Sequence, residues 1–363
     1  PQVVFLVTGW KSHPVDAELR QRMPRLKLIA HLAGTVKGVL TQGVASSGLR
    51  VVSAAEANAK PVAEFTLAHI LLHLKRVADW RSLYREKRSR IDTRNTRFGG
   101  PLGNAGRTVG IIGASRIGRR VAEDLRRHGV SVLLHDPFVS AETAASFGAQ
   151  KVEMAALLRR SDVVSLHQPL LPTTERSFGA AEFARMRDGA LLINTARGRI
   201  IDSDALEAAM SGGRLFAVLD VTDPEPLPDT SPLWDMPNVT ITPHIAGSFG
   251  CEVCAMTELV LDDIGRFTRD EPMQNEVVIA DYLLGAVEGF ARYYQDRLFE
   301  RLKPHVGSRL YVVGLEPYPR RTRDPWGQVI VEIARLRDAC ILLAGQGTYR
   351  EYPLEWTLRH LEF

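Results

Sequence analysis

The stretch VGIIGASRIGRRVAEDLRRHGVSVLLHD, residues 109–136, decides the fold of this 363-residue chain. Its β-branched start predicts a buried strand over residues 108–112, which runs directly into a glycine-rich turn. Apolar residues then recur at helical spacing until Gly129, and an apolar run at 132–134 predicts the next strand. A strand, a glycine turn, a helix and a second strand in this order are typical of a Rossmann-type unit that holds a dinucleotide.

The turn departs from the strict G-x-G-x-x-G pattern, because Ser115 stands where the middle glycine is expected. Serine is small, so we expect an adjusted contact to the cofactor diphosphate rather than a lost site. Asp136 lies 23 residues after Gly113, near the ~20 expected for the acid that binds ribose hydroxyls. A carboxylate there accepts from a 2′-hydroxyl and repels a 2′-phosphate, which favours NAD over NADP. The predicted cofactor residues of this unit are Gly113, Ser115, Arg116, Ile117, Gly118 and Asp136.

Four further apolar runs predict strands at residues 162–166, 190–193, 215–219 and 239–241. One of the helices between them is predicted to begin at a cap supplied by Asp202 or Ser203. Strands that alternate with helices over this length predict the α/β class, with a doubly wound parallel sheet. Ligands of such sheets bind at the carboxyl ends of the strands.

Three polar segments fall at those predicted strand ends: NTARG (194–198), DVTDPEP (220–226) and TPHIAG (242–247). They supply an arginine, a glutamate and a histidine, namely Arg197, Glu225 and His244. A fixed cation can clamp a carboxylate, a carboxylate can hold an imidazole protonated, and the imidazole can pass its proton to a carbonyl oxygen. Together with hydride from a nicotinamide, this set suits reduction of a 2-oxo acid, or oxidation of a 2-hydroxy acid.

Residues 28–278 resemble the D-isomer-specific 2-hydroxyacid dehydrogenases. The matching segments, in chain order, are VGIIGASRIGRRVA, HDPF, VSLHQPLLPTTERSFG, LLINTARGRIIDSDAL, LDVTDPEPLP and TPHIAGS. The resemblance implies that Arg197 binds the substrate carboxylate and carbonyl and that His244 is the acid and base. It also implies that Glu225 pairs with His244 and keeps the imidazole charged.

The resemblance favours Glu225 over the nearby Asp223, because Glu225 stands immediately before Pro226, as in the family. The further cofactor contacts that it implies are His167, Pro169, Thr174, Thr195, Ala196, Asp220 and Gly247. It places the backbone N–H groups of Gly34, Thr35 and Val36 around the substrate carboxylate, and it implies a homodimer.

The expected domains are a flavodoxin-like but incomplete substrate domain at 1–80, a Rossmann NAD-binding domain at 81–245, a return helix at 246–278 and an α/β-like tail of unknown role at 279–363. Within the first domain, strands are predicted at 3–7 and 26–30. Pro61 is predicted to begin a helix, since proline suits a first turn.

Both ends of the chain differ from the family. Members usually begin with a strand-helix-strand-helix unit before the strand at 3–7. The tail is predicted to hold a helix at 282–301, a strand at 310–313, a helix at 328–336, a strand or helix end at 339–343 and a helix at 354–361. We favour a fragment or a fused segment. Circular permutation is the alternative, and it would place residues 310–313 beside 3–7.

Net charge, hydropathy and cysteine count limit the classes of partner and the compartment that can be expected. The net charge is +4, but the arginines are scattered, so no nucleic acid is expected. No apolar run reaches membrane-spanning length and no secretory signal opens the chain, so we expect a cytoplasmic protein. Three cysteines argue against a disulfide framework. The C-x-x-C of Cys251 and Cys254 lacks a second ligand pair, so no metal is expected.

Two other functions stay open at this point. Some relatives act as NAD-sensing corepressors, and an incomplete substrate domain suits an inactive cofactor-binding remnant. Nor does the sequence identify the substrate among glyoxylate, hydroxypyruvate, pyruvate and bulkier 2-oxo acids.

Overall fold

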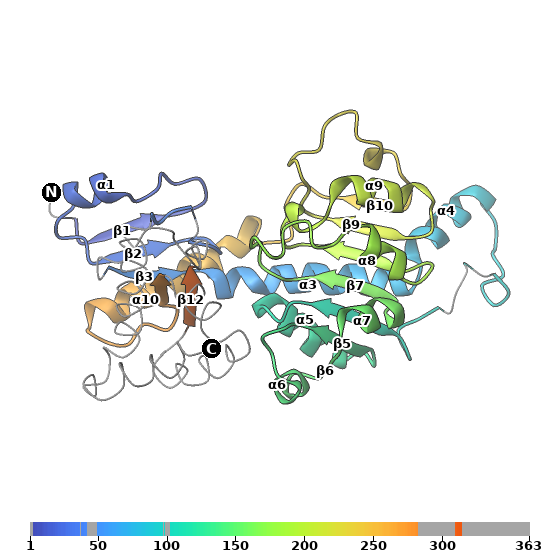
Figure 1. Ribbon diagram of the computed structural model, residues 1–363, viewed down its shortest axis with the longest axis horizontal. Coiled ribbons are helices and arrows are strands. Elements are labelled where there is room, and N and C mark those ends of the chain that lie inside the picture. Colours follow the sequence, from blue (N-terminus) through green and yellow to red (C-terminus); the bar gives the residue numbers. More distant parts are fainter. Residues whose placement is uncertain are drawn as a thin grey trace, which may run out of the picture. The chain divides into compact units, whose positions relative to one another are not determined.

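Short runs of aliphatic residues in the middle of the chain form one seven-stranded sheet in the computed structural model (Figure 1). The structure describes residues 3–36, 38–41, 49–96, 98, 102–281 and 309–313. Contacts divide the chain into two compact units. Unit 1 comprises Pro1–Glu56 and Cys254–Phe363, and unit 2 comprises Ala57–Val253.

The sheet of unit 2 is parallel throughout, with the order β10-β9-β8-β7-β4-β5-β6. Its strands are β4 (Thr108–Ile112), β5 (Ser131–His135), β6 (Ala149–Lys151), β7 (Val163–Leu166), β8 (Leu191–Asn194), β9 (Phe216–Leu219) and β10 (Val239–Ile241). The chain runs outward from β4 to β6 and then returns to the other side of β4 through β7. The reversal between β4 and β7 is the topological switch point at which such sheets bind ligands.

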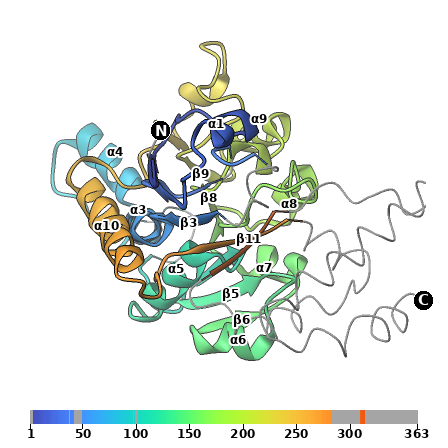
Figure 2. The same cartoon turned by 90° about the vertical axis from the view of Figure 1, so that its left-hand side faces the viewer.

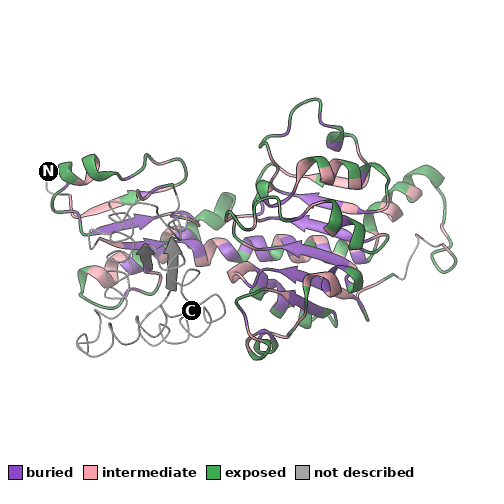
Figure 3. Ribbon diagram, viewed as in Figure 1, coloured by how far each residue is buried: buried purple, intermediate pink, exposed green. Residues whose placement is uncertain are grey.

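Helices cover both faces of this sheet, because side chains alternate along each strand. Val109 and Ile111 of β4 pack into one buried cluster, whereas Ile112 packs into the other. The first cluster joins α3 (Ala55–Leu74) and α5 (Arg116–Arg126) to the sheet. The second joins α7 (Met154–Arg160), α8 (Ala180–Arg185) and α9 (Ser203–Ser211). Figure 2 shows α5 and α7 on opposite sides of the strands, and Figure 3 shows these strands as the buried centre of the unit.

The remaining elements of unit 2 are short or peripheral. They are α4 (Val77–Lys87), α6 (Ala141–Ser146) and the 3-10 turns η1 (Gly198–Ile200), η2 (Pro232–Trp234) and η3 (Gly250–Glu252). The predicted doubly wound parallel sheet is thus confirmed, and β4 and β10 have the predicted bounds. The helix α9 begins after Asp202, whose carboxylate accepts from the Ala205 N–H at 2.9 Å, so Asp202 is the cap and Ser203 is not.

The predicted start of one helix was wrong. Pro61 does not begin α3 but lies inside it, six residues after its first residue, Ala55. The buried positions Ala55, Ala59 and Val62 already follow helical spacing before and around the proline, and this periodicity outweighs the single N–H that Pro61 cannot donate.

Unit 1 contains a smaller parallel sheet, β1-β2-β3, formed by β1 (Phe5–Thr8), β2 (Leu28–His31) and β3 (Arg50–Ser53). Its other elements are α1 (Ala17–Arg22), α10 (Val253–Thr268), β11 (Val277–Asp281) and β12 (Arg309–Val313). The Arg50 guanidinium donates two hydrogen bonds of 2.7 Å to the Glu276 carboxylate, which ties the chain after α10 to β3. The sequence predicted β1 and β2 to within two residues but gave no signal for β3 or α1.

The domain boundaries differ from those expected. The division falls at residues 56/57 rather than 80/81, because Ala63, Ile70 and Leu74 of α3 pack into the core of unit 2. The predicted strand in the tail is present as β12, but it pairs with β11 in parallel and not with β1. The pairing that circular permutation requires is therefore not seen in the described residues. The predicted helices at 282–301, 328–336 and 354–361, and the element at 339–343, lie outside them.

None of the helices in the described part of the chain is long and apolar enough to cross a membrane.

Candidate active site

The turn between β4 and α5 is built around two glycines that no other residue could replace without movement. Gly113 has a φ of +95°, and a Cβ there would lie 2.5 Å from the Gln168 backbone nitrogen. A Cβ at Gly118 would lie 2.3 Å from the Gly113 carbonyl oxygen. The two glycines thus let the backbone pack closely at the start of α5, the helix N-terminus at which such folds bind a dinucleotide diphosphate.

The serine that replaces the middle glycine has a structural role. Ser115 is the N-cap of α5, and its hydroxyl accepts from the Gly118 N–H at 3.3 Å. Asp136 follows β5 and accepts from the Ala114 N–H at 2.7 Å and from the Phe138 N–H at 2.8 Å. The acid predicted to bind the ribose is therefore fixed against the turn predicted to bind the diphosphate. The residues present fit a dinucleotide.

His167 lies under this turn rather than on its surface. Its side chain is buried, Nε2 lies 2.9 Å from the Ser165 hydroxyl, and a Cβ at Gly118 would come within 3.2 Å of it. Thr174, also predicted at the cofactor, uses its hydroxyl to close its own loop, donating to the Pro169 carbonyl at 2.6 Å. Both residues support the loop after β7.

The buried histidines predict a pH dependence of stability. Burial lowers the pKa of His167 to about 3 and that of His73 to about 4, whereas both titrate near 6.5 in an unfolded chain. Below pH 6.5 the unfolded chain binds protons that the folded chain does not. The free energy of unfolding should therefore fall as the pH drops toward 4, by up to ~1.4 kcal/mol per pH unit for a fully buried histidine.

Urea unfolding of the full chain at pH values from 7.5 to 4.5 measures this slope. His167→Asn retains a hydrogen-bonding group beside Ser165 and should flatten the slope. His128→Asn, at an exposed position, is the control and should keep it. Superimposable slopes for His167→Asn and the unchanged chain would contradict the prediction.

The loop after β8 carries Arg197. Asn194, the last residue of β8, is fully buried; its Oδ1 accepts from the Ala196 N–H at 3.0 Å and its Nδ2 donates to the Arg197 carbonyl at 2.9 Å. Asn194 thereby shapes the turn that presents Arg197. The Arg197 side chain is exposed, and its Nη1 donates to the Ala196 carbonyl at 2.6 Å.

The loop after β9 lies directly against this turn. A Cβ at Gly198 would lie 1.9 Å from the Thr222 carbonyl oxygen, so only glycine permits the approach. This packing holds the segment that leads to Glu225 next to the segment that carries Arg197. Within the described residues, the Arg197 guanidinium nevertheless forms no ion pair with Glu225, whose carboxylate contacts His244.

Glu225 and His244 are brought together as predicted from the sequence. His244 Nδ1 lies 2.7 Å from Glu225 Oε1, and the two side chains are 52% and 43% exposed. This contact occupies Nδ1 and leaves Nε2 as the ring nitrogen that can exchange a proton with a ligand. The backbone of His244 has a φ of +57°, a left-handed conformation that few residues other than glycine adopt.

Asp220 holds the turn that carries His244. Its carboxylate is 2% exposed and accepts three hydrogen bonds, from the Thr242 hydroxyl at 2.6 Å, the Ile245 N–H at 2.8 Å and the Ala246 N–H at 2.9 Å. Sequence reasoning placed Asp220 at the nicotinamide and missed this role. Only the position of Asp220 directly after β9 hinted at it.

Two other predicted cofactor residues contact α3. Thr195 is buried, and its hydroxyl oxygen lies 3.4 Å from the hydroxyl oxygen of Thr66 in α3. Gly247 packs against Asn58, whose Oδ1 accepts from the Ser248 N–H at 2.8 Å. The sequence gave no role to Asn58 or Thr66, because their contacts join segments far apart in the chain.

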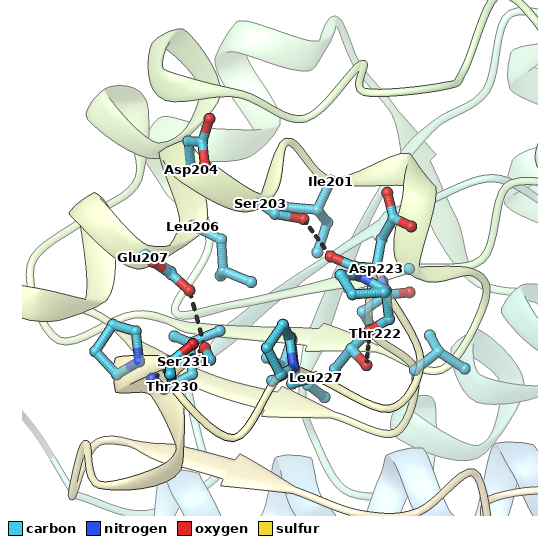
Figure 4. Close-up of a pocket in the computed structure, with 18 residues that line it drawn as sticks. Ile201, Ser203, Asp204, Leu206, Glu207, Thr222, Asp223, Leu227, Thr230 and Ser231 are labelled. Carbon is cyan, nitrogen blue, oxygen red and sulfur yellow. Dashed lines mark hydrogen bonds between the residues drawn. The ribbon is translucent and has the colours of Figure 1, made fainter.

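A cavity of about 260 Å³ lies beneath the two loops (Figure 4). Its wall includes Gly198 and Pro224, which adjoin Arg197 and Glu225 in the chain, but not Arg197, Glu225 or His244. Two hydrogen bonds join residues of this wall: the Ser203 hydroxyl donates to the Asp223 carbonyl, and the Ser231 hydroxyl donates to the Glu207 carboxylate (Figure 4). The cavity therefore backs onto the loops and is separate from the predicted substrate site.

The predicted substrate residues of unit 1 lie in the loop after β2. Gly34 and Thr35 are partly exposed, whereas the Val36 side chain is buried in the core of this unit. The Val36 carbonyl accepts from the Val39 N–H at 3.1 Å, which closes the loop. Its role in holding a carboxylate stays a prediction.

Comparisons with known proteins agree with this geometry. A family model described as D-isomer specific 2-hydroxyacid dehydrogenase, NAD binding domain, matches residues 67–246. A glyoxylate reductase of Korarchaeum cryptofilum is 31% identical over 73% of this chain and 80% of its own length. A D-3-phosphoglycerate dehydrogenase of Archaeoglobus fulgidus is 34% identical over 72% of this chain but 49% of its own length, so this chain spans about half of that relative.

Among solved structures, the D-mandelate dehydrogenase of Rhodotorula graminis aligns with a TM-score of 0.65 at 27% identity, over 76% of this chain and 83% of its own. The sequence matches, the fold and the positions of the site residues all indicate the same family. This chain belongs to the D-isomer specific 2-hydroxyacid dehydrogenase family, and unit 2 contains the family's NAD-binding domain.

Proposed function

We propose that this chain reduces a 2-oxo acid with NADH, and oxidises the corresponding 2-hydroxy acid in reverse. The observation that carries the proposal is the contact of 2.7 Å between His244 Nδ1 and Glu225 Oε1. Glu225 follows β9, His244 follows β10 and Arg197 follows β8, so all three lie at the carboxyl-end edge of the sheet. A bound nicotinamide would supply or accept the hydride. The glycine turn and Asp136 are the groups that would hold its diphosphate and ribose.

Different side chains transfer the proton, bind the substrate carboxylate and position the histidine. Glu225 accepts the Nδ1 proton of His244 in a hydrogen bond and so stabilises the imidazolium, which gives its Nε2 proton to the oxygen of the 2-oxo group. Arg197 offers the planar pair of N–H donors that matches a carboxylate, and its charge supports the developing alkoxide. Asp220 keeps His244 in its strained conformation while the proton moves.

The direct test is NADH oxidation by the full chain against a panel of small and bulky 2-oxo acids. Turnover that the His244→Ala variant lacks would support the proposal and identify the substrate class. NADH binding without turnover on any acid would contradict it, and would favour an NAD-sensing binding protein or an inactive remnant instead.

Arg197→Lys should be a poor enzyme although it retains the charge. Lysine lacks the second coplanar donor, and one charge-assisted hydrogen bond to a ligand is worth about 1.5–3 kcal/mol, so kcat/KM should fall about tenfold or more. The control is Arg199→Lys, two residues along, where the exposed arginine pairs with Glu175. Steady-state kinetics with the best acid of the panel measures both. Equal losses in the two variants would show that Arg197 is not the carboxylate clamp.

We also propose that the protein is a cytoplasmic homodimer. The two described cysteines, Cys251 and Cys254, are free and exposed, which suits a reducing compartment. Leu72 and Val77 expose apolar side chains near the junction of α3 and α4, where a second copy could cover them. Light scattering on the purified chain would give its mass.

A further inference from the structure

A small pocket lies at the edge of the unit 2 sheet opposite to the predicted active site. We call it the amino-edge pocket; its volume is about 90 Å³, and its wall includes Arg76, Arg107, Asp162, Arg187, Asp188 and Gly189. Arg107 immediately precedes β4 and Asp162 immediately precedes β7, whereas the predicted catalytic residues follow the last residues of their strands. Strands of four or five residues separate these two edges by roughly 13–17 Å.

Arg107 has a hydrogen-bonding group that nothing in the described part of the chain satisfies. The residue is 6% exposed; Nε donates to the Gly103 carbonyl at 3.1 Å and Nη1 to Asp162 Oδ1 at 3.2 Å. Its Nη2 is buried and has no partner among the described residues. An unsatisfied buried donor costs about 1–3 kcal/mol, more when it is charged, so this position favours a ligand that accepts hydrogen bonds.

The carboxylates on the pocket wall already accept hydrogen bonds from other groups. Asp162 Oδ1 is shared by Nη1 of Arg107 and Nη1 of Arg187, which lies at 3.0 Å, and Oδ2 accepts from the Thr108 N–H at 2.9 Å. Asp188 pairs with Arg214 at 3.2 Å. These carboxylates cannot turn to Nη2 without giving up the bonds that they make.

The pocket also has more positive than negative charge. Arg76 is neutralised by Asp79 and lies over the Phe216 ring at 4.4 Å. Among the described residues, the wall itself has three guanidinium groups, of Arg76, Arg107 and Arg187, and two carboxylates, of Asp162 and Asp188. Their ion-pair partners outside the wall, Asp79 and Arg214, add one charge of each sign, so the excess of one positive charge remains. Burial lowers the pKa of His73 to about 4, so this imidazole adds no charge near neutral pH.

We propose that the amino-edge pocket binds a small oxyanion, a single phosphate or carboxylate group, on the exposed guanidinium of Arg187, and that a small shift of the wall on binding gives it the buried Arg107 Nη2 as a second donor. A water molecule could satisfy the free donor, but it would leave the excess positive charge uncompensated. An oxyanion supplies both an acceptor and a negative charge, and it suits the paired donors of a guanidinium. The site is independent of the cofactor, since the glycine turn lies at the other edge of the sheet.

Calorimetric titration of the full chain tests this. Sodium phosphate and sodium acetate are the probes, at pH 7.5 and constant ionic strength, each with and without saturating NADH. Arg107→Lys retains the charge beside Asp162 but lacks Nη2, and Arg187→Gln removes the second guanidinium from a side chain that is 48% exposed. Arg159→Gln, an exposed arginine of α7 outside the pocket wall, is the control.

Saturable binding should persist with NADH present, and its Kd should rise about tenfold or more in both pocket variants but not in Arg159→Gln. Acetate binding as well as phosphate would identify a general oxyanion site, and phosphate alone would identify a phosphate site. Two results would overturn the proposal: no saturable binding of either probe, which leaves water in the pocket, or binding that NADH displaces and the pocket variants do not weaken. Should Arg107→Lys unfold, Arg187→Gln decides the matter.

Discussion

His244→Ala should lower kcat about 10²–10⁴-fold, the usual contribution of a positioned general acid or base, while the Kd for NADH changes little. The imidazole is half exposed and its structural contacts are few, so its removal should not unfold the chain. Stopped-flow single-turnover rates with the best 2-oxo acid, and NADH fluorescence titration, measure the two quantities separately.

The exposed His128→Ala is the control for loss of an imidazole as such. Glu225→Gln should give a smaller loss, because the amide still accepts the Nδ1 hydrogen bond of His244 but no longer supplies a charge. Undiminished turnover in His244→Ala would remove this histidine from the mechanism. A large rise in the Kd for NADH with a normal rate would make it a cofactor contact instead.

The central strands of the NAD-binding domain were predictable because most of their residues are buried, whereas the edge strand β6 (Ala149–Lys151) was not predicted. Buried strands read as continuous aliphatic runs, and the one at 108–112 has the predicted bounds. The edge strand at 239–241 also has the predicted bounds, although its residues are partly or fully exposed. The glycine turn was equally clear, since Gly113 and Gly118 are required by close backbone packing. In contrast, β3 (Arg50–Ser53) is four residues long and begins with an arginine bound to Glu276, far along the chain. The contact of Arg50 with this distant partner leaves no local signal in the sequence.

In the candidate site, too, some residues could be predicted from the sequence and others could not. Arg197, Glu225 and His244 were predicted as catalytic because strand ends and segment order point to them, and their roles stay a prediction. The residues that hold them were not found, because a hydrogen bond between distant segments leaves no trace in one sequence. Asn194 was taken only as the first residue of the segment after a strand, and Asp220 was predicted to contact the nicotinamide. Both use their side chains to shape the loops, as the distances at Arg197 and at the Thr242–Ala246 turn show.

Asp220→Asn should therefore impair catalysis without removing any group that reacts. The Ile245 N–H donates to Oδ1 and the Ala246 N–H to Oδ2, and in asparagine an NH₂ group replaces one of these oxygens and would face a donor. The turn would then lose the bonds that keep His244 at a φ of +57°, a conformation that costs of the order of 1 kcal/mol or more. A displacement of about 1 Å at a catalytic group can cost about a hundredfold in rate, so kcat should fall by about that factor.

Three measurements separate this positioning role from the cofactor role that the sequence suggested. In the positioning case, kcat falls, the Kd for NADH stays within a few-fold, and urea unfolding shows a loss of about 1–3 kcal/mol for the unsatisfied buried donor. Thr242→Val, which removes only the hydroxyl partner of Asp220, should lower kcat less, and the exposed Asp235→Asn should change nothing. A direct nicotinamide contact predicts the opposite pattern, a raised Kd for NADH with stability unchanged. Because the folded chain already has all three bonds to the Asp220 carboxylate, we expect the first pattern.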